Sequence, residues 1–293
     1  MIDEYNDTYL LDGWDLSSAA VSIETAEGLQ DAPEVVGDLV ELPGLDGAYD
    51  PYGGPGQPRP LDGVGRIRFS LGLRGVDPDT GVFVSGDDTA ARYFALVDEV
   101  IRRVYRRRVL ITHPRPDGAR VATARLMPGT SIAPAREPSS PWLGRARLDF
   151  VIPSAHWLDE VPVSTGVVSL ASGGMLDLSA FAGATAPCTD LLVRFFAGSN
   201  PRLTTSYNRV GWLGVIASGR QVQYETATGL ITRGGGSAWP TGDGHPGYGG
   251  EDFSPGPLKW EVDPGEPLEA VLTHTGGSPM SVEVTGRRRY RTS

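Results

Sequence analysis

Hydrophobic and polar residues alternate in two stretches of the first half of the chain, residues 64–74 and 146–152. Every second position is hydrophobic: Ile67, Phe69, Leu71 and Leu73 in the first stretch, and Ala146, Leu148, Phe150 and Ile152 in the second. A period of two is typical of a strand with one buried face. Pro153 follows the second stretch and has no N–H to donate to a neighbouring strand, so we expect the strand to end there.

A period of three to four residues predicts one long helix at about residues 88–108. The positions that share its buried face are Tyr93, Leu96, Val97, Val100, Ile101 and Val104. Asp87 or Asp88 can cap its start, because a carboxylate accepts hydrogen bonds from the free N–H groups of a first turn. The last turns of this predicted helix carry Arg102, Arg103, Arg106, Arg107 and Arg108.

The second half of the chain has almost no helical signal. Its strand-like runs are "DLLVRFFAG", "GWLGVIASGRQVQYET", "LITRG", "PLKWEV", "LEAVLTHT" and "MSVEV". Ser218-Gly219 predicts a two-residue hairpin turn. Short strands at this spacing are typical of a β-sandwich or jelly roll. Residues 157–165 then form a junction between two domains, residues 1–160 and 161–293.

We therefore predict a mainly β protein. Its first domain is of β-barrel or β-sandwich type with one principal helix, and its second domain is a β-sandwich. Two stretches rich in glycine and proline, residues 43–60 and 234–250, read as loops. The first is long for a loop within a compact domain, and such loops often contact a partner or move.

Composition and charge restrict the classes of function. No apolar run approaches the roughly 18 residues that would suggest a membrane span, and the first residues lack the profile of a secretory signal. The single cysteine, Cys188, has no partner for an internal disulfide, and we expect it in the core. The net charge of −10 argues against general binding to phosphate backbones.

The charge is unevenly distributed along the chain. Residues 1–80 hold 16 acids and 4 arginines, whereas residues 81–158 hold 12 arginines and 7 acids. Residues 159–293 hold 13 acids and 10 basic residues. The acids of the first segment can therefore be neutralised by arginines of the second, either within one subunit or between neighbouring copies.

The sequence offers no recognisable catalytic, cofactor or metal motif, and we expect none of these sites. Residues 242–247 match the spacing of a dinucleotide-binding glycine loop, but no strand leads in and no helix follows. Nearby, the spacing of Asp243, His245, Glu251 and Asp252 fits neither a calcium loop nor a zinc pattern. The chain also lacks the H-E-x-x-H motif and the G-x-S-x-G elbow.

The arginines of the predicted helix have three interpretations. They can bind nucleic acid, they can solvate the end of a helix, which favours cations, or they can face a protein partner. We favour the protein-facing role and take Arg102, Arg103, Arg106 and Arg107 as candidate inter-subunit contacts. Because neighbouring like charges repel, we predict that some of them pair with carboxylates among residues 1–80, in the same subunit or the next.

The order of these parts resembles the distal tail protein of long, non-contractile-tailed bacteriophages. The resemblance lies in an acidic strand-rich start, the helix after "GDDTAARYFALVDEVIRRVYRRR", the strand of "RARLDFVIPSAHWLDE" with its proline and tryptophan, "DLLVRFFAGSNPRLTT" and the closing "MSVEVTGRRRYRTS". It covers most of the chain but not the loops 43–60 and 234–250.

The resemblance implies a structural virion protein at the tail tip. It implies a belt-like, ring-forming first domain and a galectin-like second domain outside the ring. Six copies would join the tail tube to the tail-tip proteins and leave a channel for DNA. It implies a protein that is not an enzyme and does not itself bind membranes.

Two other classes of function remain open at the sequence level. A carbohydrate-binding module would present aromatic side chains to sugars, and Trp239, Tyr248, Trp260 or Tyr224 are the candidates, although β-sandwich cores use the same residue types. A glycoside hydrolase would need two carboxylates brought together by the fold, and a sequence alone can neither show nor exclude such a pair.

Overall fold

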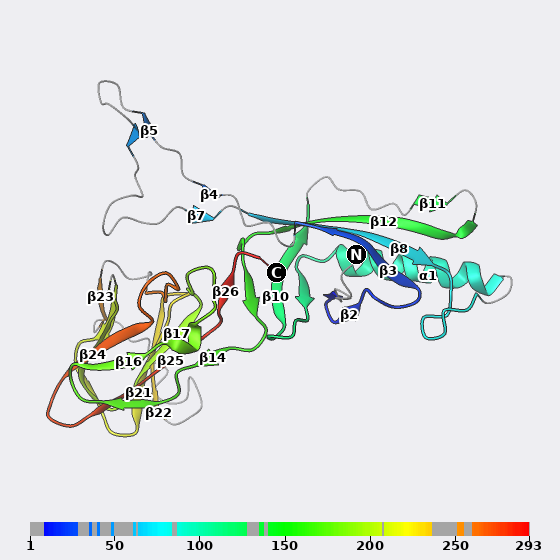
Figure 1. Ribbon diagram of the computed structural model, residues 1–293. Coiled ribbons are helices and arrows are strands. Elements are labelled where there is room, and N and C mark those ends of the chain that lie inside the picture. Colours follow the sequence, from blue (N-terminus) through cyan, green and yellow to red (C-terminus); the bar gives the residue numbers. More distant parts are fainter. Residues whose placement is uncertain are drawn as a thin grey trace. The chain divides into compact units, whose positions relative to one another are not determined.

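The computed structural model describes residues 9–28, 35–36, 40–41, 48–49, 61–62, 64–83, 87–127, 135–137, 140–206, 208–235, 251–254 and 260–292. It is mainly β, as predicted, with one α-helix among these residues (Figure 1). The chain divides into two compact units. The described residues up to Glu160 and from Tyr290 onward belong to the first unit, and Val161–Arg289 belong to the second.

The first unit contains α1 (Asp87–Val104) and most of the early strands. These are β1 (Leu10–Leu11), β2 (Trp14–Asp15), β3 (Val21–Glu27), β4 (Val35–Val36), β5 (Val40–Glu41), β6 (Ala48–Tyr49), β7 (Leu61–Asp62), β8 (Gly65–Arg74), β9 (Val109–His113), β10 (Arg120–Leu126), β11 (Ala135–Glu137), β12 (Ser140–Ile152) and β13 (Trp157–Asp159). The short strand β26 (Arg289–Tyr290) enters this unit with Tyr290.

Ten strands of the first unit form one sheet in the order β2-β1-β9-β10-β12-β8-β3, with β11 beside β12, and β13 and β26 beyond β10. All pairs with a described register are antiparallel, and β8 and β12 make the longest, from Leu143 opposite Arg74 to Ile152 opposite Gly65. The predicted faces of these two strands are confirmed, because Phe69, Leu71, Leu148 and Phe150 are fully buried. The strand β12 ends directly before Pro153, also as predicted.

The helix α1 lies along β8 and β12, and its buried face completes the core of this unit (Figure 1). Tyr93, Val100 and Val104 point into that core, as their spacing predicted. The strands β9 and β10 pair antiparallel and form a hairpin through residues 114–119. No helix of the described residues has the length and apolar character that a membrane span requires.

The segment expected to be a loop at residues 43–60 contains paired backbone where the structure describes it. Val40–Glu41 pair with Ala48–Tyr49, and Val35–Val36 pair with Leu61–Asp62. Valine favours extended backbone, and Val35, Val36 and Val40 all lie in these short strands. The remainder of this loop, and most of the loop 234–250, lie outside the described residues.

The second unit is a sandwich of two antiparallel sheets. Its strands are β14 (Val163–Ser164), β15 (Val168–Leu170), β16 (Gly174–Asp177), β17 (Leu191–Phe195), β18 (Gly198–Thr204), β19 (Arg209–Trp212), β20 (Val215–Ile216), β21 (Arg220–Glu225), β22 (Leu230–Gly235), β23 (Glu251–Ser254), β24 (Glu269–Thr275) and β25 (Met280–Gly286), with a short 3₁₀ helix at Ser179–Phe181.

One sheet of the sandwich has the order β14-β25-β17-β21-β22, with β15 beside β25. The other has the order β16-β24-β18-β19-β23, with β20 beside β18. Alternate residues of both sheets fill the space between them, including Val193, Phe195, Leu203 and Leu272. Cys188 is fully buried in the same core, as expected.

Candidate functional site

The helix α1 ends at Val104, earlier than the predicted end near residue 108. Arg106, Arg107 and Arg108 therefore lie beyond the helix, not on its last turns as predicted. The physical reason lies in burial. Val104 is the last helical residue buried in the core, and the chain must then turn outward so that Val109 can enter β9.

Arg102 and Arg103 share one carboxylate on the helix itself. Both guanidinium groups contact Glu99, one turn earlier. The Arg103 guanidinium also lies 5.3 Å from the centre of the Trp14 ring, and its Nη1 donates long hydrogen bonds of 3.4 Å to the carbonyls of Leu11 and Asp12. Arg103 thus joins the helix end to the strands β1 and β2 within one subunit.

Arg106 confirms the prediction that a helix-end arginine pairs with an acid among the first 80 residues. Its Nη1 lies 2.8 Å from Oδ2 of Asp12 in the same subunit. The other oxygen of that carboxylate, Oδ1, accepts the backbone N–H of Leu110 at 2.8 Å. Asp12 adopts a left-handed backbone conformation (φ 49°), and these contacts hold the β1–β2 turn against β9.

Arg107 and Arg108 remain after these assignments. Both are exposed, and neither makes an ion pair with another described residue. Of the four candidate contacts, Arg107 is thus the one whose charge is not already engaged by a described carboxylate. Tyr105 beside them is 57% exposed, so the outer surface here presents an aromatic ring between cations.

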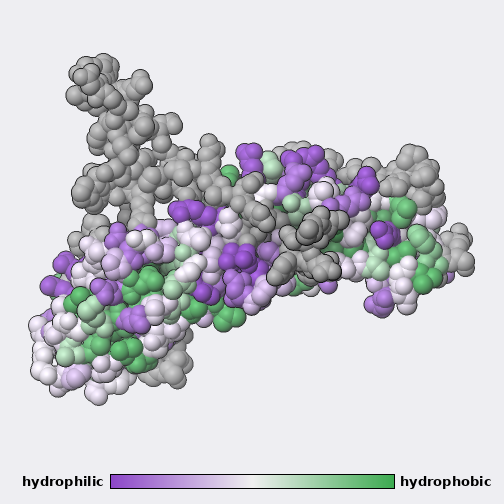
Figure 2. Space-filling model, in the orientation of Figure 1, coloured by the Kyte–Doolittle hydropathy of each residue, from purple (hydrophilic) through white to green (hydrophobic). Residues whose placement is uncertain are grey.

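A second group of arginines lies on the outward side of the large sheet. We call it the arginine face, and it consists of Arg66, Arg68, Arg74, Arg125, Arg145 and Arg147 on β8, β10 and β12. Directly paired residues share a face of a sheet. Arg125 and Arg66 are both register partners of Val151, so they lie on the same side. Figure 2 shows hydrophilic side chains over the part of the first unit where these strands run.

Acids of the same face neutralise only part of this charge. Arg68 contacts Asp149 and donates to Glu27 at 2.9 Å, while Arg145 lies 3.0 Å from Glu24. The hydrogen bond that Arg68 donates to Asp149 raises the pKa of Arg68. Arg66, Arg74 and Arg125 are exposed and make no ion pair with a described residue. Three cations of this face are therefore available to an acidic partner.

The sequence contains a signal for the arginine face that differs from the helical one. In "VGRIRFSLGLR" the arginines alternate with the buried hydrophobic residues. A period of two places them together on the opposite face of the strand. The same alternation gives Arg145 and Arg147 in β12.

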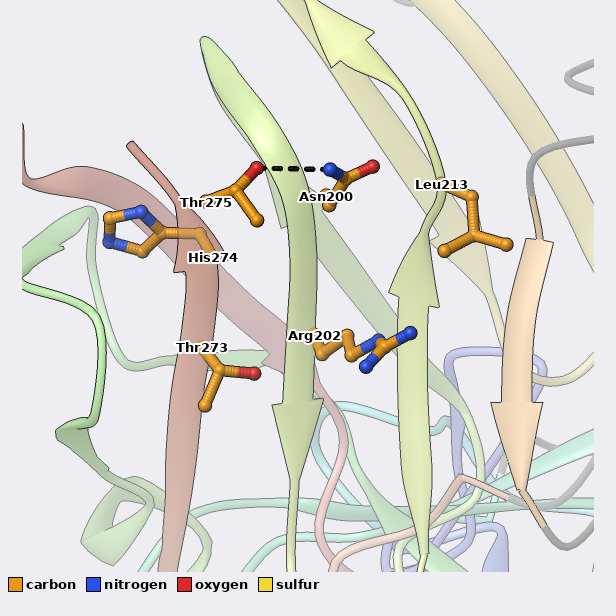
Figure 3. Close-up of a pocket in the computed structure, with 6 residues that line it drawn as sticks. All are labelled: Asn200, Arg202, Leu213, Thr273, His274 and Thr275. Carbon is orange, nitrogen blue, oxygen red and sulfur yellow. Dashed lines mark hydrogen bonds between the residues drawn. The ribbon is translucent and has the colours of Figure 1, made fainter. Parts of the chain in front are cut away.

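The second unit carries an open hollow of about 370 Å³ on the outer side of one sheet (Figure 3). Its lining residues are Asn200, Arg202, Leu213, Thr273, His274 and Thr275. Asn200 is held in place, since its Nδ2 donates to Thr275 Oγ1 at 2.9 Å and its Oδ1 accepts the Gly214 N–H at 2.7 Å. His274 Nε2 lies 3.2 Å from the Leu170 carbonyl oxygen.

The aromatic residues proposed for sugar binding do not line this hollow. Trp260 and Tyr224 are both only 2% exposed, so their rings belong to the sandwich core and cannot contact a sugar. These two sugar-binding candidates are therefore wrong. Burial also raises the pKa of Tyr224 to about 12. Trp239 and Tyr248 lie outside the described residues, as do Asp243 and His245. Within the described part of the chain no cluster of three or more metal-binding side chains occurs.

Comparisons with known proteins give a structural likeness at low identity. No protein-family model matches the chain, and a search of curated proteins finds no match. The chain is similar to one in "Structure of the Phage P2 Baseplate in its Activated Conformation with Ca", with 9% identity, a TM-score of 0.46, and coverage of 98% of this chain and 99% of that chain. The corresponding structure with Sr gives the same values.

Proposed function

We propose that this chain is a distal tail protein of a long, non-contractile-tailed bacteriophage. In this proposal it is a structural virion protein of the tail tip, without catalytic or cofactor chemistry. Six copies form a ring through the first unit, join the tail tube to the tail-tip proteins, and leave a channel through which DNA passes. The order of parts along the sequence supports this assignment, because one helix and a large sheet precede a separate β-sandwich.

The observation that carries the proposal is the separation of charge within the first unit. Residues 31–62, which we call the acidic segment, hold seven acids and one arginine. The arginine face and the end of α1 hold exposed arginines without an ion partner among the described residues, namely Arg66, Arg74, Arg107, Arg108 and Arg125. A subunit that carries an acidic segment and a basic surface can bind the next copy head to tail.

Head-to-tail contacts generate closed rings when the rotation between subunits divides a full turn. Each subunit then needs two different surfaces that complement each other, which the charge separation supplies. Pairing the arginines with the acidic segment of a neighbour also neutralises cations that would otherwise retain DNA phosphates during passage. Charged interfaces of this kind should weaken as salt screens them.

The experiment that tests the proposal is the mass and shape of the full-length protein in solution. We expect a six-subunit mass by light scattering and ring-shaped particles by electron microscopy at low salt. The Arg66→Glu and Arg125→Glu double variant should shift the population toward monomers, and the Arg287→Glu variant in the second unit is the matched control. A monomer at all concentrations and salt levels would refute the ring.

A further inference from the structure

The first unit is discontinuous, because residues from Tyr290 onward belong to it although they follow the whole second unit in sequence. The strand β26 pairs with β13, which itself pairs with β10. The neighbouring residue, Arg289, belongs to the second unit, where its backbone carbonyl accepts the N–H groups of Thr185 and Ala186 at 2.9 and 3.1 Å. Among the described residues, the chain thus passes between the units at two places, after Glu160 and after Arg289.

Tyr290 is built into the first unit by three kinds of contact. Its ring is 4% exposed and belongs to the hydrophobic core of that unit. Its hydroxyl donates to Oδ1 of the buried Asp159 at 2.9 Å. The guanidinium of the buried Arg120 lies 3.7 Å from the centre of its ring, within the range of a cation–π interaction.

Two buried charged residues, Arg120 and Asp159, surround Tyr290, and burial makes the charged form of each less favourable. Arg120 is 8% exposed and Asp159 is 7% exposed, and burial lowers the pKa of the Arg120 guanidinium. Arg120 also donates to the backbone carbonyl of Thr292 at 3.1 Å and lies 3.4 Å from the Asp117 carboxylate, so residues 290–292 add to the partners of both buried groups. Each hydrogen bond to a buried charge offsets part of the cost of burying it.

We infer that residues 290–292 act as a clasp that completes the first unit after the second unit has been synthesised. The ribosome makes a chain from its N-terminus toward its C-terminus, so the sheet of the first unit lacks β26 until Val161–Arg289 have been made. Until then Asp159 and Arg120 lack the partners that Tyr290 and Thr292 supply. This inference rests in part on the proposed function, because it makes ring assembly depend on a chain that includes the clasp.

The clasp is tested on the full chain by hydrogen exchange of the backbone amides. Tyr290→Ala should raise exchange in β9, β10 and β13 by about 10-fold to 100-fold, while β17 and β25 of the second unit keep their protection. Tyr290→Phe removes only the hydroxyl and should give a smaller rise in the same strands. Arg287→Ala, three positions earlier in the second unit, is the control and should change neither unit.

Ring formation by the same variants distinguishes a clasp that only stabilises the first unit from one that ring assembly also requires. If the wild-type chain stays monomeric, the ring proposal fails, and the clasp is still decided by exchange in β10 and β13. If the wild-type chain forms rings, Tyr290→Ala should reduce the ring population more than Arg287→Ala does. Unchanged exchange in both Tyr290 variants would overturn the clasp. Raised exchange with undiminished rings would overturn its role in assembly.

Discussion

Different kinds of contact stabilise the first unit and the second unit internally. In the first unit, ion pairs join elements that are far apart in sequence, as in Arg68–Glu27, Arg145–Glu24 and Arg106–Asp12. In the second unit the outer contacts are mostly between neutral groups, as in Asn200–Thr275 and Ser172–His274, while an apolar core separates the two sheets.

If the proposed ring forms, this difference favours the first unit as the source of its charged contacts. Ion pairs on a surface are individually weak, each worth about 0–1 kcal/mol, so the described pairs contribute little to the stability of the first unit. They do organise a charged surface from which some arginines are left over. The second unit has one described ion pair, Arg194–Glu283 at 3.0 Å, and we expect its stability to depend less on salt than that of the first unit.

The largest expected effect is a loss of stability when a core residue is replaced, and it tests whether the two units unfold independently. Phe195 in the second unit and Phe150 in the first are both almost fully buried. Replacing either with alanine leaves a cavity and should cost about 3–5 kcal/mol. In differential scanning calorimetry, Phe195→Ala should lower the unfolding temperature of one transition and Phe150→Ala that of the other. A single transition shifted equally by both variants would show that the units unfold as one.

The sequence predicted the faces of the strands better than their partners. Alternation identified the buried side of β8 and β12, because burial depends on the local period. The turn at Ser218-Gly219 exists, but β20 before it pairs with β18 and β21 after it pairs with β17 and β22, so it joins two sheets and is not a hairpin. Pairing depends on contacts distant in sequence that no local pattern encodes.

The candidate contacts were predicted in the same partial way. The arginine run was visible, but its charges extended the helical pattern past Val104, where the hydrophobic residues that hold a helix against the core end. Asp12 as the partner of Arg106 depends on a turn with a left-handed residue, which the sequence did not reveal. Tyr290 lies among arginines without any period, so nothing local marked it as a core residue.

The next expected effect distinguishes a structural arginine from a surface arginine. Arg103 is partly buried and contacts Glu99, the Trp14 ring and two backbone carbonyls. Losing these contacts in Arg103→Ala should destabilise the first unit by about 1–3 kcal/mol. Arg107→Ala should stay within about 0.5 kcal/mol of the wild type, because Arg107 is exposed and makes no ion pair with a described residue.

Urea unfolding of both variants at equal ionic strength measures this difference. The ring assay should give the opposite order, since Arg107 is a candidate inter-subunit contact and Arg103 is engaged within its own subunit. Equal losses of stability in the two variants would mean that the contacts of Arg103 contribute nothing measurable. A ring unaffected by Arg107→Glu would remove Arg107 from the proposed interface.

The smallest expected effect concerns one exposed ion pair and its dependence on pH. Asp77 starts a tight turn in which its Oδ1 accepts the N–H of Thr80 at 3.0 Å, and its Oδ2 accepts from Nη1 of Arg92 on α1 at 2.7 Å. The hydrogen bond from Arg92 is the main cause that lowers the pKa of Asp77 from 3.8 to about 2, and the bonds from Thr80 add to it.

A carboxyl group whose pKa is lower in the folded state stabilises that state when it is ionised. The contribution of Asp77 is therefore fully present above its unfolded pKa of 3.8 and is lost as the pH falls through its folded pKa of about 2. Asp77→Asn should slightly lower the unfolding temperature of the first unit at pH 7, and the difference in unfolding temperature from the wild type should narrow as the pH falls from about 5 toward 2.

Asp79→Asn in the same exposed turn is the matched control, because Asp79 makes no ion pair with a described residue. Thermal unfolding across this pH range, repeated at high salt to screen the pair, measures this difference. A difference in unfolding temperature that widens as the pH falls would contradict the expected loss of the Asp77 contribution at low pH. The Arg92–Asp77 pair would then not stabilise the contact between this turn and the helix.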